Sequence, residues 1–275
     1  MSDIEVGLSD EEREIRDVTR KFVEEVVRPA GIALDRLHDP ADVIAQGSVL
    51  WRVFERYREL GLNGLESGEA NVDPASSARI RYLVNEEIGW GDSGIAISLG
   101  VAGFPGMFAK IAGRPELIER FASPDNPEIG CWAITEPDHG SDTLAFDQPH
   151  FDDPRIRANC IATKEGDEWV IRGQKAAWVS NGTIADVAAL FCTIDPSRGF
   201  QGGGVAVVPL DLPGVSRGKP LDKLGQRALN QGEIFFDDVR IPEEYMVVGA
   251  DAYGFVVESV LTLANAAMGD RKSVV

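Results

Sequence analysis

Two places in the chain carry residues whose types and spacing could do chemistry. The first lies at the end of an apolar run and in the loop that follows it. That run ends in Thr135, and a short loop then leads through Pro137 to Gly140 and Ser141. A strand that ends in a hydroxyl can present Thr135 to the polar edge of a flat apolar ring. Glycine at position 140 lets backbone N–H groups approach a phosphate closely. The pattern predicts a turn that binds a nucleotide-like ligand.

The second place is a later apolar run that carries Trp178, Val179 and Ser180. Residues two apart in a strand lie on the same face, so we expect the Trp178 indole and the Ser180 hydroxyl to point the same way. The indole offers a wide surface to a flat heteroaromatic ring, and the hydroxyl can reach the heteroatoms of that ring. Taken alone, each motif is also explained by a strand entering a turn or by a core aromatic residue.

The elements that must position these residues change in kind along the chain, and the part before residue 122 is expected to be helical. Ser9 and Glu12 have the spacing of a capping box. The apolar residues that follow recur on one helical face until Pro29, which we expect to end that helix. Further helices are predicted over 49–62, 75–88 and 117–121, and again over 253–268.

Between Ser123 and about Val239 the pattern changes to short strands and turns. Apolar and β-branched runs alternate with turn signals such as Asn181-Gly182. Short strands at this spacing favour an antiparallel sandwich or barrel, and the lack of alternating strand–helix units disfavours a Rossmann sheet. The predicted strands cover 129–135, 156–163, 168–171, 185–194, 205–208 and 233–236.

The predicted fold is therefore of the α+β class, with several domains. We expect an N-terminal helical domain over 1–122, a central antiparallel β-sandwich or barrel domain over 123–240, and the start of a C-terminal helical domain over 241–275. The last helix has no partner after it for its apolar face. Residues 270–275 match what a sequencing-library adapter encodes in frame, so we interpret them as non-native and expect the natural chain to continue past Gly269.

Three stretches of the chain together resemble the acyl-CoA dehydrogenase family. The first is Trp132 to Asp142, where an apolar strand ends in Thr-Glu-Pro and the loop ends in Gly-Ser-Asp. The second, Ile171 to Gly182, is similar to the family's second flavin-facing strand. The third combines 224–227 with 234–242 and is similar to its closing strands. The resemblance runs over essentially the whole chain and is weakest before about residue 80.

The resemblance implies an enzyme that uses FAD for α,β-dehydrogenation of an acyl-CoA thioester. It implies an electron-transfer flavoprotein as electron acceptor, and a homotetramer or homodimer for the full-length protein. The family often has Thr where Ser180 stands, and the hydroxyl is kept. Ser141 would also lie near the CoA arm of the substrate. The FAD-binding residues implied are Trp132, Ile134, Thr135, Gly140, Ser141, Trp178, Val179 and Ser180.

The resemblance assigns no catalytic residue within this chain. In most members the base is a glutamate far into the C-terminal helical domain, which the chain does not reach. A minority place it on the first helix after the sheet, where this chain has Asn265 and Ala266. Glu258 lies two turns earlier, and we interpret it as a solvated helix residue. We therefore expect weak or absent dehydrogenation from these residues alone.

Two alternative functions stay open. The parent protein could be an acyl-CoA oxidase or a flavin monooxygenase of the same fold, which oxygen consumption would reveal. It could also be a non-enzymatic flavin- or nucleotide-binding module. His139 and His150 lie near several aspartates, but their spacing matches no familiar ligand pattern, so no metal is expected. Gly202 to Gly204 are interpreted as a flexible strand connection, and Arg198 as a surface residue.

The composition of the chain limits which other kinds of partner it can bind. Asp and Glu number 45 against 27 for Lys and Arg, and the formal charge of −18 disfavours nucleic acid and anionic membranes. No apolar run was found near the ~20 residues of a membrane-spanning helix, and the first residues do not form a secretory signal. The three separated cysteines are predicted to be buried and reduced. We therefore expect a cytoplasmic protein.

Overall fold

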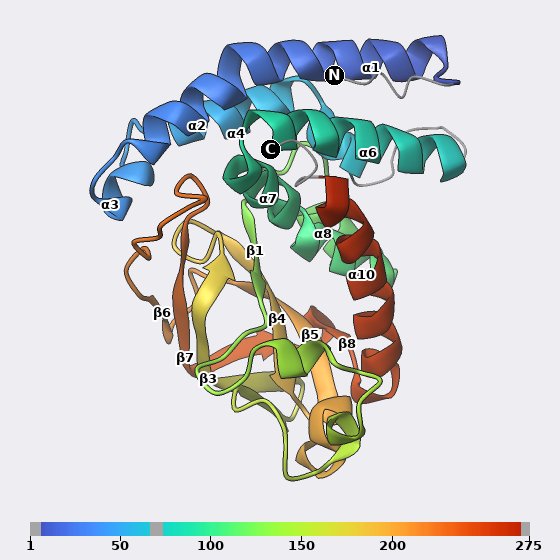
Figure 1. Ribbon diagram of the computed structural model, residues 1–275. Helices are drawn as coiled ribbons and strands as arrows, with labels where there is room; N and C mark the ends of the chain where they lie inside the picture. Colours follow the sequence, from blue (N-terminus) through green and yellow to red (C-terminus); the bar gives the residue numbers. More distant parts are fainter. Residues whose placement is uncertain (1–6, 67–73, 271–275) are drawn as a thin grey trace.

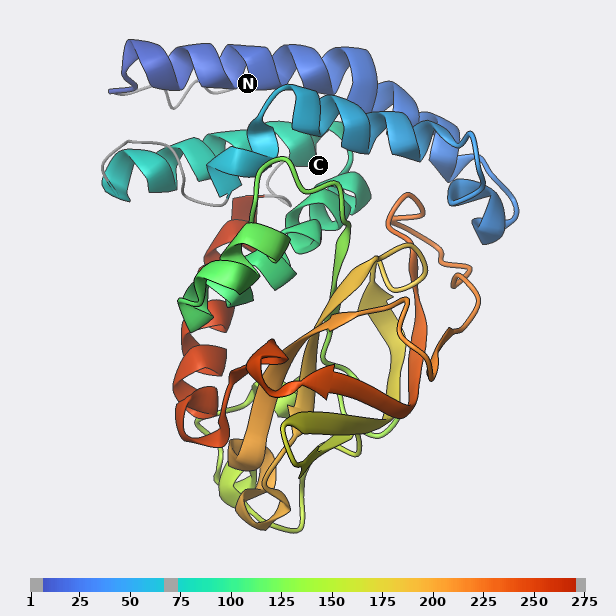
Figure 2. The same ribbon diagram turned by 180° about the vertical axis from the view of Figure 1, so that it is seen from behind.

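The structure, a computed structural model, describes residues 7–66 and 74–270. A layer of helices caps one end of a twisted β-domain, and one long helix runs from the far end of that domain up to the helical layer (Figure 1). The view from behind shows the short helices of residues 93–121, drawn in green, between the layer and the sheet (Figure 2). The predicted α+β class, with helices before and after a β-domain, is confirmed.

The first helix is longer than the sequence predicted. It begins at the capping box, where the Ser9 hydroxyl accepts from the Glu12 N–H at 3.1 Å. α1 (Asp10–Phe22), η1 (Val23–Val27) and α2 (Arg28–Asp35) then follow without a break. The expectation that Pro29 ends the helix was wrong. η1 is a π-turn, and this wider turn accommodates the proline ring that would otherwise clash with the carbonyl four residues earlier.

Helices α3 to α7 pack with the first helices around one apolar core, whereas α8 and α9 contribute to a second one on the β-domain. Leu50, Val53, Ile88 and Ile95 are among the fully buried residues of the first core. The sequence analysis assigned no separate helices to α7 and α8. α7 is apolar on nearly all sides and so lacks an amphipathic period. The elements are α3 (Pro40–Val43), α4 (Val49–Glu59), α5 (Leu62–Glu66), α6 (Pro74–Gly91), α7 (Ser93–Ala102), α8 (Phe104–Ala112) and α9 (Pro115–Phe121).

One apolar stretch is longer than the sequence analysis expected. Ser93–Ala112 is long and apolar enough to cross a membrane, although half of it is buried. It comprises α7 and α8, which contribute Leu99 and Phe108 to two different cores. Core helices of folded domains pass the same test of length and composition, so the finding is weak evidence for a membrane span.

The β-domain is a single eight-stranded sheet with the order β6-β7-β3-β1-β4-β5-β8, and β2 pairs with both β3 and β4. Most pairs are antiparallel, as predicted, but β1 and β2 each run parallel to β4. The sheet is therefore mixed. Its strands are β1 (Gly130–Ala133), β2 (Ile161–Glu165), β3 (Glu168–Ser180), β4 (Val187–Thr193), β5 (Gly203–Pro209), β6 (Val215–Arg217), β7 (Gln231–Pro242) and β8 (Met246–Val248).

Three strand predictions needed correction, and one of them is the predicted 233–236, which is part of the much longer β7. Residues 156–160 are not a strand, because the backbone N–H groups of Asn159 and Cys160 donate to the Glu136 carboxylate instead of to a ladder. β3 is much longer than the predicted 168–171 and reaches Ser180, with register shifts against β7 that absorb its bend. This extension carries the Trp178 motif into the sheet. β6 and β8 were not predicted.

α10 (Ala250–Asp270) packs on β5 and reaches α6. Gly202 to Gly204 were expected to be a flexible connection, and that was wrong, because Gly203 and Gly204 are buried residues of β5. A Cβ at Gly203 would lie 2.4 Å from the ring of Tyr253, so glycine is needed for the close approach of α10. Arg198 pairs with Asp251 at 2.8 Å at the surface, as its interpretation as a surface residue allows.

Candidate functional site

Pairing of β1 with β3 brings the two predicted motifs together. Trp132 lies opposite Ser180 in this antiparallel pair. Just beyond the strand end, the Thr135 hydroxyl donates to the Ala176 carbonyl at 2.8 Å, and the Ala176 N–H donates to the Thr135 carbonyl at 3.1 Å. Thr135 is therefore held two residues before Trp178 along β3. Its hydroxyl proton is already used, but its oxygen keeps lone pairs with which to accept.

The face of β3 that carries Trp178 and Ser180 is open. The Trp178 side chain is 61% exposed, which is unusual for an indole on a sheet. Ser180 is half-buried, and its oxygen accepts from the Gln231 amide at 3.1 Å. The two side chains share one side of the strand, as the two-residue period predicts. An aromatic surface with a hydroxyl beside it is what a flat heteroaromatic ring needs.

Val179 differs from its neighbours. Its side chain is fully buried in the core of the β-domain, beside Ile171 and Ile234. A side-chain contact between Val179 and a cofactor is excluded by this placement, because the residue points through the sheet. Only its backbone could contact a ligand on the face of Trp178.

Trp132 and Ile134 lie on the helix-covered side of β1. The Trp132 ring packs edge-on against Phe104 of α8 at 4.3 Å and beside Phe191 at 5.1 Å. Ile134 is 7% exposed and belongs to the same apolar cluster. Ile134 therefore belongs to the core, whereas the Trp132 ring is only partly buried and keeps some surface beside Ser180.

The loop after Pro137 has a different geometry from the one predicted. The Gly140 N–H donates to the Asp142 carboxylate at 2.7 Å and so is not free for a phosphate. The φ of Gly140 is −132°, and an added Cβ would meet no atom within 4 Å. The expected reason for glycine, a close backbone approach, is therefore not found here. Ser141 is exposed and begins the short 3-10 helix η2 (Ser141–Leu144).

His139 holds this loop together. Its Nδ1 lies 2.8 Å from the Asp142 carboxylate, and its ring packs edge-on against Phe200 at 5.3 Å. Burial opposes ionisation of Asp142, but hydrogen bonds from His139 and the Gly140 N–H outweigh it and lower the pKa of the carboxyl. Within residues 7–66 and 74–270 no group of three or more His, Cys, Asp or Glu is placed to hold a metal.

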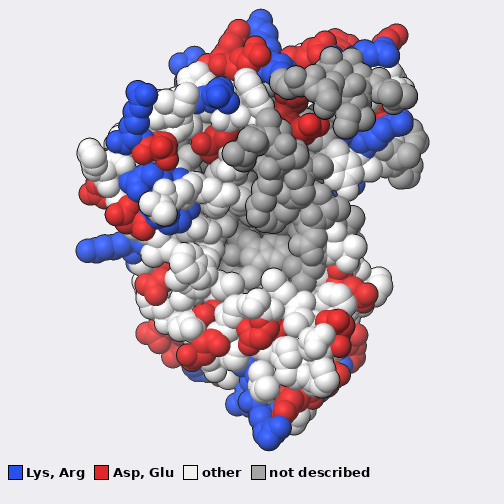
Figure 3. All heavy atoms as spheres, in the orientation of Figure 1, with Lys and Arg blue, Asp and Glu red and all other residues white. Residues whose placement is uncertain are grey.

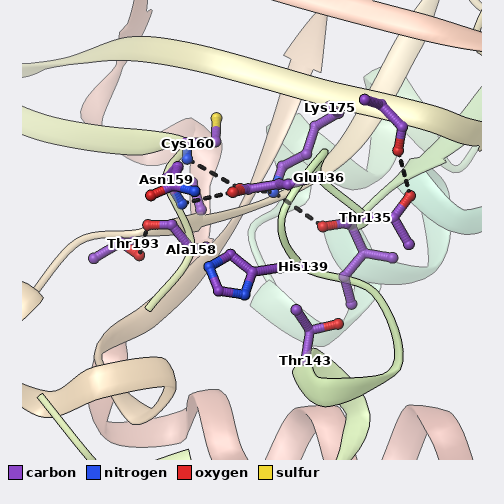
Figure 4. A network of polar contacts seen from close by, with 12 residues as sticks. Thr135, Glu136, His139, Thr143, Ala158, Asn159, Cys160, Lys175 and Thr193 are labelled. Atoms are coloured by element: carbon purple, nitrogen blue, oxygen red, sulfur yellow. Dashed lines mark hydrogen bonds and ion pairs between the residues drawn. The ribbon is translucent and has the colours of Figure 1, made fainter. Parts of the chain in front are cut away.

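A buried ion pair anchors the turn, and sequence reasoning missed it. Glu136 and Lys175 both have fully buried side chains, and Nζ of Lys175 lies 2.6 Å from the carboxylate. Lys175 also donates to the Ile134 carbonyl at 3.0 Å, and Glu136 accepts from the N–H groups of Asn159 and Cys160. Figure 4 shows Glu136 between Lys175 and these two N–H groups. The sequence carried no clear signal for the pair, because Glu136 stands in a polar turn and Lys175 follows the polar stretch 172–174.

Asn181 forms a second buried polar anchor, at the end of β3. It has a φ of 63° and no exposed surface. Its side chain accepts from the Ser98 hydroxyl at 2.6 Å and donates to the carbonyls of Ser98 and Gly130. This cluster ties α7 of the helical layer to the strand that carries Trp178 and Ser180. The turn at Asn181-Gly182 was predicted, but this connection was not.

Two family models match the chain: the N-terminal domain of acyl-CoA dehydrogenase over residues 9–124, and the middle domain of acyl-CoA dehydrogenase over residues 131–239. The chain belongs to the acyl-CoA dehydrogenase family. The resemblance identified from the motifs is thereby confirmed.

Individual relatives agree with the family models. The mitochondrial short-chain specific acyl-CoA dehydrogenase of Rattus norvegicus is 30% identical over 260 residues, which cover 92% of this chain and 56% of the relative. Cyclohex-1-ene-1-carbonyl-CoA dehydrogenase of Syntrophus aciditrophicus is 30% identical and is covered to 55%. The chain therefore spans about half the length of the curated relatives it matches.

Solved structures agree as well. A glutaryl-CoA dehydrogenase from Mycobacterium smegmatis, solved in complex with FADH2, superposes with a TM-score of 0.72 at 27% identity. The alignment covers 96% of this chain and 61% of that one. The acyl-CoA dehydrogenase fold is therefore shared over nearly the whole chain.

One hollow in the described structure lies away from the exposed indole. It has a volume of about 650 Å³, is open to solvent, and is lined by Pro137, Arg172, Gln174 and Phe235, among others. Neither Trp178 nor Ser180 lines it. The exposed indole and this hollow are therefore separate features of the β-domain.

The charges and thiols of the chain add little to this site. Acidic and basic side chains alternate over the helical layer on the face drawn in Figure 3, without a continuous basic stripe among the described residues. All three cysteines are buried and free, as predicted. Burial raises the pKa of Cys160 to about 11, so this thiol stays protonated at neutral pH.

Proposed function

We propose that this chain forms the flavin-binding part of an FAD-dependent acyl-CoA dehydrogenase. The observation that carries the proposal is the exposed Trp178 indole beside the Ser180 hydroxyl on one face of β3. Family membership supports it, as does a related structure that was solved with FADH2.

The residues of the chain would bind and orient the ring. Trp178 would stack on one side of the isoalloxazine, and Ser180 and the Thr135 oxygen would meet its polar edge. Ser141, at the exposed start of η2, would lie near the CoA arm of a thioester substrate. Bound FAD would supply the hydride acceptor at N5, while a carboxylate base removes the α-proton of the acyl group.

The proposal assigns that base to no residue in the described part of the chain. Glu258 of α10 is exposed, in agreement with its interpretation as a solvated residue. The side chains of Asn265 and Ala266, where a minority of the family places the base, lie outside the described residues, as do residues 271–275 of the suspected non-native tail. We expect these 275 residues alone to reduce an artificial dye with octanoyl-CoA weakly or not at all.

The electron acceptor and the assembly state belong to the same proposal. We expect the full-length protein to pass electrons to an electron-transfer flavoprotein, to form a homodimer or homotetramer, and to act in the cytoplasm. Reduction of that flavoprotein in an anaerobic assay would support a dehydrogenase. Rapid oxygen consumption would favour an oxidase or monooxygenase of the same fold.

Titration with FAD tests the flavin site directly. Trp178→Ala removes the stacking surface and should weaken FAD binding by roughly tenfold or more, measured by quenching of flavin fluorescence. Tyr82→Ala is the matched control, because Tyr82 is an exposed aromatic residue (41%) on α6. Equal FAD affinity in the two variants, or no binding by the unaltered chain, would contradict the proposal.

A further inference from the structure

We propose that Lys223 and Gln231 are positioning residues that turn the hydroxyl proton of Ser180 outward, so that Ser180 donates to the bound ring. This inference rests on the proposed FAD site. It concerns Lys223, in the loop before β7, and Gln231, the first residue of β7, and neither belongs to the stretches that resemble the family.

The contacts form a chain from the loop to the open face of β3. Lys223 Nζ donates to the Gln231 side-chain oxygen at 3.1 Å and to the Leu229 carbonyl at 2.5 Å. The Gln231 amide nitrogen donates to the Trp178 carbonyl at 3.2 Å and to the Ser180 hydroxyl oxygen at 3.1 Å. Gln231 and Ser180 are direct partners in the β3–β7 pairing, so the strand register fixes this contact.

The orientation of the Gln231 amide follows from the chemistry of its partners. Oxygen and nitrogen of a glutamine amide are easily exchanged in a structure, and the hydrogen-bond network must decide between them. Lys223 can only donate, so it must face the amide oxygen, and the Trp178 carbonyl can only accept, so it must face the amide nitrogen. The same nitrogen then donates its second hydrogen to Ser180.

The direction of the Ser180 hydroxyl follows in turn. A serine hydroxyl has one hydrogen to donate and two lone pairs with which to accept. Because Gln231 occupies a lone pair, the hydrogen must point elsewhere. Among the hydrogen bonds of the described residues, Ser180 Oγ appears only as an acceptor. Its proton is therefore available to a nitrogen or oxygen acceptor at the edge of an oxidised flavin.

Lys223 keeps this arrangement over a wide range of conditions. It is half-buried, and burial, with the neighbouring Arg227, lowers its pKa to about 8, while Asp92 acts in the opposite direction. A neutral amine could also accept, but the Trp178 carbonyl can only accept, so it still faces the amide nitrogen of Gln231 in either charge state of Lys223.

Gln231→Glu tests the inference, because it replaces the donor that faces Ser180 by an acceptor. A carboxylate at position 231 still accepts from Lys223 but cannot donate, so Ser180 would turn its proton inward. We expect FAD binding to weaken about 3- to 10-fold, as in Ser180→Ala. The visible absorption of bound FAD should change in the same way in both variants. Gln226→Glu, an exposed glutamine in the same loop, is the matched control and should leave both readouts unchanged.

A double variant separates positioning from general damage. If Gln231 acts through Ser180, Ser180→Ala/Gln231→Glu should bind FAD no more weakly than Ser180→Ala alone. Additive losses would mean that Gln231 has only a structural role, and the inference would be wrong.

A measurement without FAD tests the inference independently of the proposed function. Neutron diffraction from deuterated crystals of the chain should show the Ser180 deuteron pointing away from Gln231 and two deuterons on the amide nitrogen that faces the Trp178 carbonyl. A Ser180 deuteron directed at Gln231 would overturn the inference even if FAD binds. Failure of the unaltered chain to bind FAD, with the deuterons as expected, would remove only the proposed function.

Discussion

The two faces of β3 have opposite surroundings, although their residues alternate along the same strand. Lys175 and Val179 point into the β-domain and have no exposed surface. Trp178 and Ser180 point outward, where the indole is 61% exposed. The inner face has every polar group of its ion pair satisfied within the protein, whereas the outer face keeps an aromatic surface and a hydroxyl for a ligand. One strand thus serves as both anchor and binding surface.

This difference separates stability from binding. Changes on the inner face should cost folding free energy, because a buried charge without its partner is poorly solvated. Changes on the outer face should alter FAD affinity with little effect on folding. The following predictions test that separation, in order of decreasing effect.

Lys175→Met should have the largest effect. It leaves the Glu136 carboxylate buried without its cation and should lower the free energy of unfolding by about 3–5 kcal/mol. Urea denaturation would measure this. Lys164→Met is the control, because Lys164 pairs with Glu243 at the surface with both side chains about half exposed, and it should cost roughly 1 kcal/mol or less. Similar losses in both variants would remove the special role of the inner face.

Asn181→Ala should come next. It removes the hydrogen bonds to Ser98 and Gly130. The backbone keeps its φ of 63°, and alanine has no polar side chain whose hydrogen bonds offset the strain of that conformation. We expect a loss of about 2–4 kcal/mol in urea denaturation. Asn181→Gly keeps the backbone freedom and should be less damaging by about 1 kcal/mol. A glycine variant that is less stable than the alanine variant would contradict this account.

Thr135→Val should have a smaller effect on folding, because it removes the single side-chain bond to the Ala176 carbonyl. The expected loss is about 0.5–1.5 kcal/mol. FAD affinity should fall as well, because the oxygen that would meet the ring edge is gone. Calorimetry of unfolding and an FAD titration would measure the two effects. Full FAD affinity in this variant would show that Thr135 does not contact the ring and that only the residues of β3 do.

The pH dependence of stability should be the subtlest effect. Burial lowers the pKa of Lys223 to about 8 from its ordinary 10.5, so between these values the unfolded chain holds a proton that the folded chain has released. The free energy of unfolding contributed by this group therefore rises with pH across that window and is constant below it. Lys223→Met should lack this rise when urea midpoints are compared on either side of the window. An unchanged pH profile would show that Lys223 titrates normally.

Much of the site was predictable because its signals are local. The capping box at Ser9, the turn at Asn181-Gly182 and the shared face of Trp178 and Ser180 depend only on residues a few positions apart. The continuation of the helix through Pro29 was not predictable in this way. It depends on a π-turn that buries Val23 and Val27 in the helical core.

The sequence by itself determined which residues are available for chemistry, the order of helices and strands, and the family to which the chain belongs, because periodicity and motif spacing are properties of neighbouring positions. The tertiary structure decided which of these groups are buried and which remain exposed to a ligand. It paired Glu136 with Lys175 across 39 positions and set Gln231 opposite Ser180 across 51. Such contacts arise only when distant strands meet, because burial and register depend on the whole sheet.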